Sequence, residues 1–216
     1  MPDGFLRRFD QEKCSLRSRV ISRCVEQHSG SIGIIGSKRT GKNTFCERFE
    51  RLDKGVIEDK VKKVPCRQLY IDHSKVRVPG KTGTTLLRMH IYFSIQERLY
   101  YERLTRDVRG LVFLFDLSRR KSTLKEAGLS LKQLEIEMED DIMPPYIFVG
   151  NKKDKRLSKN RKYEKNEKAE KKALEIYQAR EYFECSAKVG IGCFPLAQYI
   201  IQNYTGERPF ERSPED

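Results

Sequence analysis

Long apolar runs are missing from this sequence. No stretch approaches the roughly 18 consecutive apolar residues that a membrane-spanning helix needs. The first residues, MPDGFLRRFDQEK, lack the apolar core of a signal peptide. Lipid-anchor motifs are missing as well, because Gly4 lies too far along the chain for myristoylation and the last twenty residues contain no Cys for prenylation.

Paired cysteines and clustered histidines are also missing. The six Cys residues form no C-x-x-C pair and the three His residues are scattered, which disfavours a metal cluster. These absences favour a reduced cytosolic or nuclear protein, and we expect a cytoplasmic one, in which most cysteines are small core residues.

Charge, by contrast, is abundant. Charged residues make up 35% of the 216-residue chain and the net charge is +13, whereas the usual charged fraction is about 25%. Such a balance favours anionic partners, namely nucleic acid, an acidic membrane, an acidic protein surface or a phosphate ligand. Charge alone does not choose among them.

Strand-like and helix-like segments alternate along the chain. This alternation predicts an α/β fold with a doubly wound, mostly parallel, six-stranded sheet, in which ligands bind at the carboxyl ends of the strands. The strand-like segments, some with the loop that ends them, are 31–36, 67–72, 75–79, 86–93, 110–118, 145–154 and 181–188; the predicted helices follow the first strand and cover 124–138, 163–180 and 193–204.

We assign residues 30–205 to one domain, with a polar tail at 206–216. The basic extension 1–29 has apolar residues at helical spacing over 5–25, which predicts an amphipathic helix. Two interpretations of that helix stay open: it packs on the domain, or it binds a membrane or a partner protein.

The segment Gly36 to Lys42 reads GSKRTGK and fits the pattern G-x-x-x-x-G-K between a strand and a helix. Two glycines let the backbone wrap closely around phosphate oxygens, and successive N–H groups at the helix N-terminus face the anion. Lys42 is positioned to reach the terminal phosphates. The pattern therefore predicts a phosphate-binding loop.

Two further motifs follow later strands: Asn151-Lys152-Lys153-Asp154, which is N-K-x-D, and Ser186-Ala187-Lys188. Guanine offers two adjacent donors, N1–H and the 2-amino group, and a fixed carboxylate such as Asp154 accepts both. Adenine lacks those donors, so the buried carboxylate would stay unpaired, and such sites can discriminate by about 10⁴-fold. The Ala187 N–H can donate to the guanine carbonyl, and the stems of Lys152 and Lys188 can cover base and sugar.

In order and strand placement these three motifs resemble the guanine-nucleotide motifs of the Ras-superfamily small GTPases, over roughly residues 30–205. Gln96-Glu97-Arg98 also resembles that family's Q-E-R. The resemblance implies a P-loop fold of the small-GTPase type, a GTP or GDP ligand, protein effectors or regulators, and a catalytic position at Gln96. The nucleotide-binding residues it implies are Gly36, Ser37, Lys38, Arg39, Thr40, Gly41, Lys42, Asn43, Thr44, Asn151, Lys152, Asp154, Ser186, Ala187 and Lys188, with a metal position at Asn43.

The elements that hold magnesium in that family are altered here. Asn43 replaces the Ser/Thr after the loop Lys; an amide oxygen can ligate a hard cation, but Mg²⁺ demands near-ideal octahedral geometry. No Thr occurs between Phe45 and Lys81, and Cys66 occupies the place of the switch Thr. The D-x-x-G motif is replaced by Tyr92 to Ile95. We therefore expect weak or absent GTP hydrolysis and leave bound magnesium uncertain.

Three local questions stay open. Lys38 and Arg39 stand where the family has small residues; they either offset lost magnesium charge or are solvated surface cations. Gln96 is either a helix-start residue or a catalytic remnant. Residues 152–172 hold eleven Lys/Arg against four acids, so this arm is either a solvated helix or a patch for phosphate, nucleic acid or acidic lipid.

Three functions compete. The chain is a guanine-nucleotide-binding protein that cycles poorly and acts through protein partners in signalling or trafficking. Alternatively it is an active GTPase with atypical magnesium coordination, or a basic nucleic-acid-binding protein on the same frame.

Overall fold

The computed structural model describes residues 27–53, 55–57, 61, 63, 65–79, 83–92, 108–119, 122–138, 142–157 and 166–206. The predicted helix at 5–25, Gln96 and nearly all of the predicted tail 206–216 lie outside these residues. The middle of the basic arm, 158–165, lies outside them as well.

Six strands form one sheet in the order β2-β3-β1-β4-β5-β6. The β2–β3 pair is antiparallel, and every other neighbouring pair is parallel. This confirms the predicted α/β fold with a mostly parallel six-stranded sheet. The strands are β1 (Gln27–Ile35), β2 (Cys66–Asp72), β3 (Thr84–Tyr92), β4 (Gly110–Asp116), β5 (Tyr146–Asn151) and β6 (Glu181–Glu184).

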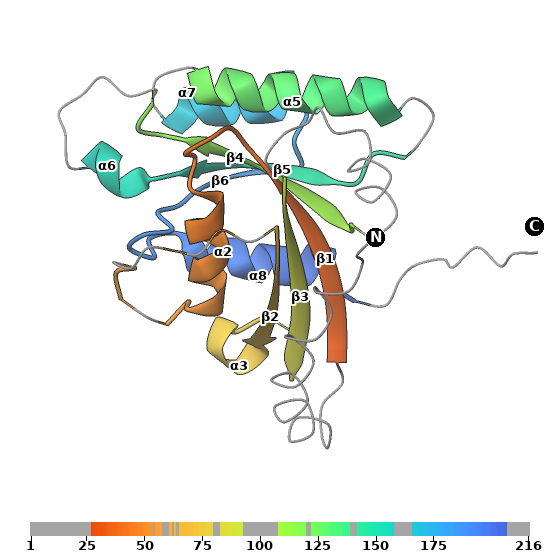
Figure 1. Ribbon diagram of the computed structural model, residues 1–216, viewed down its shortest axis with the longest axis vertical. Helices are drawn as coiled ribbons and strands as arrows, with labels where there is room; N and C mark the ends of the chain where they lie inside the picture. The colour runs from red at the N-terminus through yellow and green to blue at the C-terminus, as the bar shows by residue number, and fades with distance from the viewer. Residues whose placement is uncertain are drawn as a thin grey trace, which may run out of the picture.

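Helices cover both faces of this sheet, with α5 and α7 on one side and α2 and α8 on the other (Figure 1). The connections between parallel strands place helices in this way because each must cross over the sheet. The helices are α2 (Lys42–Glu50), α3 (His73–Val76), α5 (Ser122–Met138), α6 (Lys153–Leu157), α7 (Asn166–Lys171), the π-helix η1 (Lys172–Ile176) and α8 (Cys193–Tyr204).

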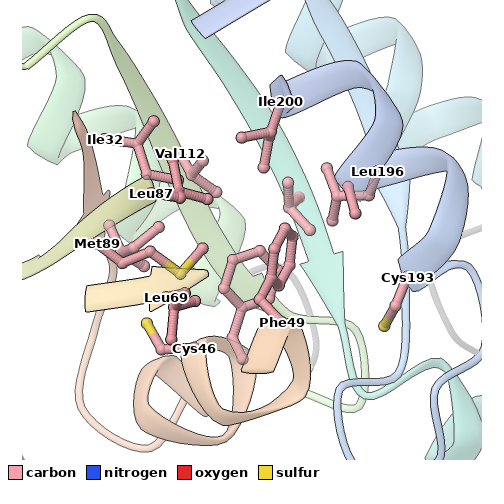
Figure 2. Packing of buried hydrophobic residues seen from close by; sticks show 14 of the residues in the cluster. Ile32, Cys46, Phe49, Leu69, Leu87, Met89, Val112, Cys193, Leu196 and Ile200 are labelled. Carbon is pink, nitrogen blue, oxygen red and sulfur yellow. The ribbon is translucent and has the colours of Figure 1, made fainter. Parts of the chain in front are cut away.

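Two apolar clusters fix the layers. On one face, Phe49 of α2 and Leu196 of α8 pack with strand residues such as Leu87 and Val112 (Figure 2). On the other face, the apolar stripe of α5, which includes Leu131, packs on the opposite side of β4 and β5. All seven residues of β4 are buried, as expected for a central strand covered on both faces.

The end of α8 returns to the beginning of β1. A Cβ at Gly30 would lie 2.6 Å from Thr205 Cγ2, and the Gly206 N–H donates to Ser29 O at 3.5 Å. The two ends of the domain therefore lie side by side, at the edge of the sheet opposite the carboxyl ends of the parallel strands.

The prediction of a strand at 75–79 is wrong. Residues 73–76 form α3, and Arg77 follows with a φ of 52°. Val76 and Val78 alternate as in a strand, but β2 and β3 are antiparallel neighbours with Asp72 paired to Thr84. The chain between them has to reverse, and one helical turn buries Val76 under α8, where Gln198 Nε2 donates to Val76 O at 2.8 Å.

Two predicted boundaries also shift. β1 begins at Gln27 rather than at residue 31, because the parallel pairing with β3 continues over these residues, from Gln27 beside Thr84 to Gly30 beside Leu87. The predicted helix 163–180 is described from Asn166 and ends in the π-turns of η1, where the Tyr177 N–H donates to Lys172 O at 3.0 Å. No described helix has both the length and the apolar composition of a membrane span.

Candidate functional site

The loops that leave β1, β4, β5 and β6 meet at one edge of the sheet, joined by hydrogen bonds between them. These loops contain the residues 36–42, 116–118, 151–154 and 185–188. The four strands are consecutive and parallel in the sheet, so their carboxyl ends share that edge. The structure thus brings together all three motifs that the sequence singled out.

The segment 36–42 forms a tight loop between β1 and α2. A Cβ at Gly36 would lie 2.3 Å from the backbone oxygen of Leu114, so only glycine fits. Thr40 Oγ1 donates to Ser37 O at 3.0 Å, which closes the loop on itself. Gly41 precedes α2 with a φ of 95°, and the Phe45 N–H donates to its carbonyl at 2.8 Å.

Lys42 lies inside this loop. Its ammonium donates to Gly36 O and, at 3.0 Å, to Ser37 O, and the residue is only 5% exposed. Burial lowers the pKa of Lys42 to about 8. A buried ammonium beside the N–H groups of a helix N-terminus attracts an anion such as phosphate. A bound phosphate would in turn stabilise the charged form of Lys42.

The cations Lys38 and Arg39 are exposed at the tip of the loop. Arg39 has a φ of 68°, a left-handed conformation that costs a non-glycine residue energy. Its carbonyl accepts a hydrogen bond from Lys152 Nζ, which ties the loop tip to the end of β5. The position of the two cations is consistent with either interpretation of their role.

Asn151 is the residue that joins the loops. It is 2% exposed, its Nδ2 donates to Thr40 O at 3.0 Å, and its Oδ1 accepts the N–H of Ala187 at 3.0 Å and that of Lys152 at 2.8 Å. The amide therefore positions the 36–42 loop against the loop after β6. The Ala187 N–H, which we expected to face a guanine carbonyl, already donates to Asn151, so a bound base would have to share it.

Lys152, which is half-buried, and Asp116, which is buried, form an ion pair beside Asn151. Lys152 Nζ lies 2.7 Å from Asp116 Oδ2, and Asp116 is 1% exposed. Burial pushes the pKa of Asp116 up, but hydrogen bonds from Lys152 and Ser118 outweigh it and hold the pKa below its ordinary value. The sequence analysis missed Asp116; the signal was a carboxylate ending an otherwise apolar strand.

Asp154 lies in the first turn of α6 and is half-buried. Its Oδ1 accepts a hydrogen bond from Ser186 Oγ, and Ser186 is fully buried. Ser186 O also accepts the Gly190 N–H at 2.7 Å, so the hydroxyl that orients the carboxylate belongs to a closed turn. The arrangement holds one carboxylate in a fixed orientation at the same edge of the sheet as the 36–42 loop.

The residues at the magnesium positions do not fit that cation. Tyr92, in place of the carboxylate, belongs to the apolar cluster under α5 and is 9% exposed. Burial raises the pKa of the Cys66 thiol, so it stays protonated and is a poor ligand. Asn43 and Thr44 are half-buried in the first turn of α2, and the described residues include no group of three His, Cys, Asp or Glu that could hold a metal ion.

The sequence analysis also missed Arg48. Arg48 of α2 is 0% exposed and donates to Ala187 O, Lys188 O, Gly55 O and Arg51 O at 2.7–3.0 Å. An arginine among the charged residues of a short helix is expected on the surface, and the sequence offers no local sign that it is buried.

In the described part of the basic arm, Lys152 to Asp154 are half-buried, whereas most residues of α7 are exposed. Lys171 Nζ lies 3.7 Å from Glu175 Oε2, an i,i+4 pair typical of a solvated helix, and Lys153 Nζ lies 3.6 Å from Glu184 Oε2.

A comparison of the chain with protein-family models and with curated proteins gives no match.

Proposed function

We propose that the chain is a guanine-nucleotide-binding protein of the Ras-like, P-loop type, with degenerate switch regions and weak or absent GTP hydrolysis. One observation carries the proposal: the Asn151 amide links the phosphate loop at Thr40 to the Ser186–Lys188 loop that orients Asp154. A phosphate cradle and a carboxylate suited to a purine edge are thereby held at a fixed separation.

The geometry supports the following division of roles. Lys42 and the N–H groups of 36–42 hold the phosphates, and Asp154 accepts N1–H and the 2-amino group of guanine. Asn151, Lys152 and Ser186 position those groups. The strand order, with one antiparallel edge strand beside five parallel ones, supports the fold type that the motifs suggested.

The same geometry supports slow chemistry. Phosphoryl transfer from a nucleoside triphosphate depends on a cation that neutralises developing charge, and the residues at the three metal positions are poor ligands for it. The protein then works by binding rather than by cycling, as a scaffold whose surface engages protein partners in signalling or trafficking.

The first test is direct binding. The purified chain is heat-denatured and any released nucleotide is identified by chromatography, and the stripped protein is titrated with GDP, GTP and ADP. We expect guanine nucleotides to bind and ADP to bind far more weakly. Absence of any guanine nucleotide binding overturns the proposal, and nucleic-acid binding that falls steeply with salt would then favour the basic-protein alternative.

Base recognition is tested by Asp154→Asn. The amide presents a donor where the carboxylate accepts, so it suits xanthine, which has a carbonyl in place of the 2-amino group. We expect the variant to lose GDP affinity and gain affinity for xanthosine diphosphate, whereas simple misfolding would lower both.

The rate of hydrolysis is tested separately, by single-turnover measurements with GTP in the presence and absence of Mg²⁺. A fast magnesium-dependent rate would favour the active-GTPase alternative.

A further inference from the structure

Arg48 holds two loops that are far apart in the sequence. Its Nε donates to Ala187 O at 2.8 Å and its Nη2 to Lys188 O at 2.8 Å. The same Nη2 donates to Gly55 O at 2.7 Å, and Nη1 donates to Arg51 O at 3.0 Å. One guanidinium therefore joins the base loop, 186–188, to the post-α2 segment, residues 51–53 and 55–57.

A backbone hydrogen bond runs parallel to this link. The Ile57 N–H donates to Lys188 O at 2.8 Å, so the carbonyl of Lys188 accepts from both Arg48 and Ile57. Ile57 is 7% exposed, whereas Gly55 is exposed. The post-α2 segment is thus accessible at Gly55 and Val56 and anchored to the base loop at Ile57.

The burial of Arg48 makes the link stiff. The side chain is 0% exposed, so a guanidinium N–H that loses its carbonyl has no water to replace it. The planar fork of arginine satisfies several carbonyls at once, which the ammonium of lysine cannot reproduce. If the post-α2 segment moves, either the base loop moves with Arg48 or a buried charge loses hydrogen bonds.

We propose that Arg48 couples the post-α2 segment to the base loop, so that a protein which displaces the post-α2 segment releases a bound guanine nucleotide from its base end. This inference rests on the proposed function and deepens it. Release by this route depends on backbone carbonyls and one guanidinium, and it requires no magnesium. Arg48 is a positioning residue here, because it acts on the base through Ala187 and Lys188.

The experiment compares Arg48→Lys and Arg48→Met with Arg67→Lys. Arg67 is matched as an arginine that contacts α2, through Glu47 at 2.7 Å, but it lies outside the base loop. We expect both Arg48 variants to release a fluorescent GDP analogue at least about tenfold faster, the change expected for losing one or two hydrogen bonds to a charged group. Arg67→Lys should release it at close to the wild-type rate.

A second measurement separates the loss of base-loop positioning by Arg48 from a general destabilisation of the nucleotide site. Pyrophosphate has no base, so its affinity should be unchanged in the Arg48 variants, whereas a destabilised phosphate loop would bind it more weakly. Equal losses of GDP and pyrophosphate affinity, or an unchanged GDP release rate, would overturn the proposal.

A second pair of variants tests the link without touching Arg48. Ile57→Pro removes both the side chain and the N–H that donates to Lys188 O, and Ile57→Ala removes the side chain alone. Faster GDP release in Ile57→Pro than in Ile57→Ala supports the coupling, and equal rates contradict it.

Hydrogen exchange separates failure of this inference from failure of the proposed function. In Arg48→Lys we expect faster exchange both at the Ile57 amide and at the Gly190 amide, which closes the turn after the base loop. If the wild-type chain binds no GDP, the function and the release step both fail, and exchange still decides whether the two loops are coupled. Unchanged exchange at either amide overturns the coupling itself.

Discussion

Lys152 Nζ lies 2.7 Å from the buried Oδ2 of Asp116, so the lysine of the N-K-x-D motif is held by a carboxylate from the neighbouring strand. Asp116 Oδ1 in turn accepts from the N–H and hydroxyl of Ser118 at 2.8 and 2.6 Å. The pair orients Lys152 toward the carbonyl of Arg39 in the phosphate loop.

Asp116→Asn should lower both stability and nucleotide affinity. The substitution leaves Lys152 without its charged partner, and we expect a loss of about 1–3 kcal/mol in the free energy of unfolding, measured by urea denaturation. A double-mutant cycle with Lys152→Met measures the interaction energy between the two side chains; additive losses would contradict a direct interaction.

The stabilisation from Asp116 should also depend on pH. Because the folded pKa of Asp116 is lowered, this stabilisation is present above the unfolded pKa, about 3.9, and is lost as the pH falls through the folded pKa.

Nucleotide affinity should fall at alkaline pH because of Lys42. Its pKa is about 8 because the ammonium is buried, and phosphate favours the charged form, so binding raises that pKa. Below about pH 8 the ammonium is already charged and affinity is flat; above it, binding takes up a proton and affinity falls by up to about tenfold per pH unit. Calorimetry in buffers of different ionisation enthalpy measures the uptake. Lys42→Arg stays charged, so persistence of the same pH dependence in that variant would refute the assignment.

Gly41→Ala should disconnect the phosphate loop from Asn151. Gly41 has a φ of 95°, and an added Cβ would lie 2.7 Å from Asn151 Nδ2. We expect a cost of about 1–2 kcal/mol from the left-handed conformation, together with a loss of nucleotide affinity. Gly55→Ala is the control, since a Cβ there meets nothing within 4 Å and its carbonyl is retained. Equal stability of the two variants would contradict the tight fit at Gly41.

Reversing the charges of Lys38 and Arg39 together should weaken GDP and GTP binding by about tenfold or more, if these cations act on the phosphates through partly screened Coulomb attraction. Lys132→Glu with Lys168→Glu is the matched control, because both lysines are exposed on α5 and α7 and the net charge changes equally. Titration calorimetry at low salt gives the affinities. Equal affinities for the two double variants would assign Lys38 and Arg39 to solvated surface.

Much of the candidate site could be predicted from the sequence because each of its motifs is a short run of consecutive residues. The phosphate loop, the N-K-x-D motif and Ser186-Ala187-Lys188 each follow a strand whose apolar run is plain in the sequence. A parallel sheet then brings strand ends together without further information. The alternation of apolar strands and amphipathic helices predicted the six-stranded α/β sheet in the same way.

The features that the sequence did not predict depend on contacts between residues far apart in the chain. Arg48 is buried only because carbonyls from two loops converge on it, and Asp116 has a role only because Lys152 reaches it from the next strand. Residues 75–79 alternate like a strand, yet the antiparallel pairing of β2 with β3 forces a reversal there. In each case tertiary geometry overrides a local pattern.

The meeting of Ser29 with Gly206 has a practical consequence. Whatever precedes β1 and whatever follows α8 attach to the body at one spot, and β1 then runs about 20 Å from Ser29 to the phosphate loop, at about 3.3 Å per residue. A label or surface tether placed at this junction would leave the loops at the carboxyl ends of the parallel strands facing the opposite way and unobstructed.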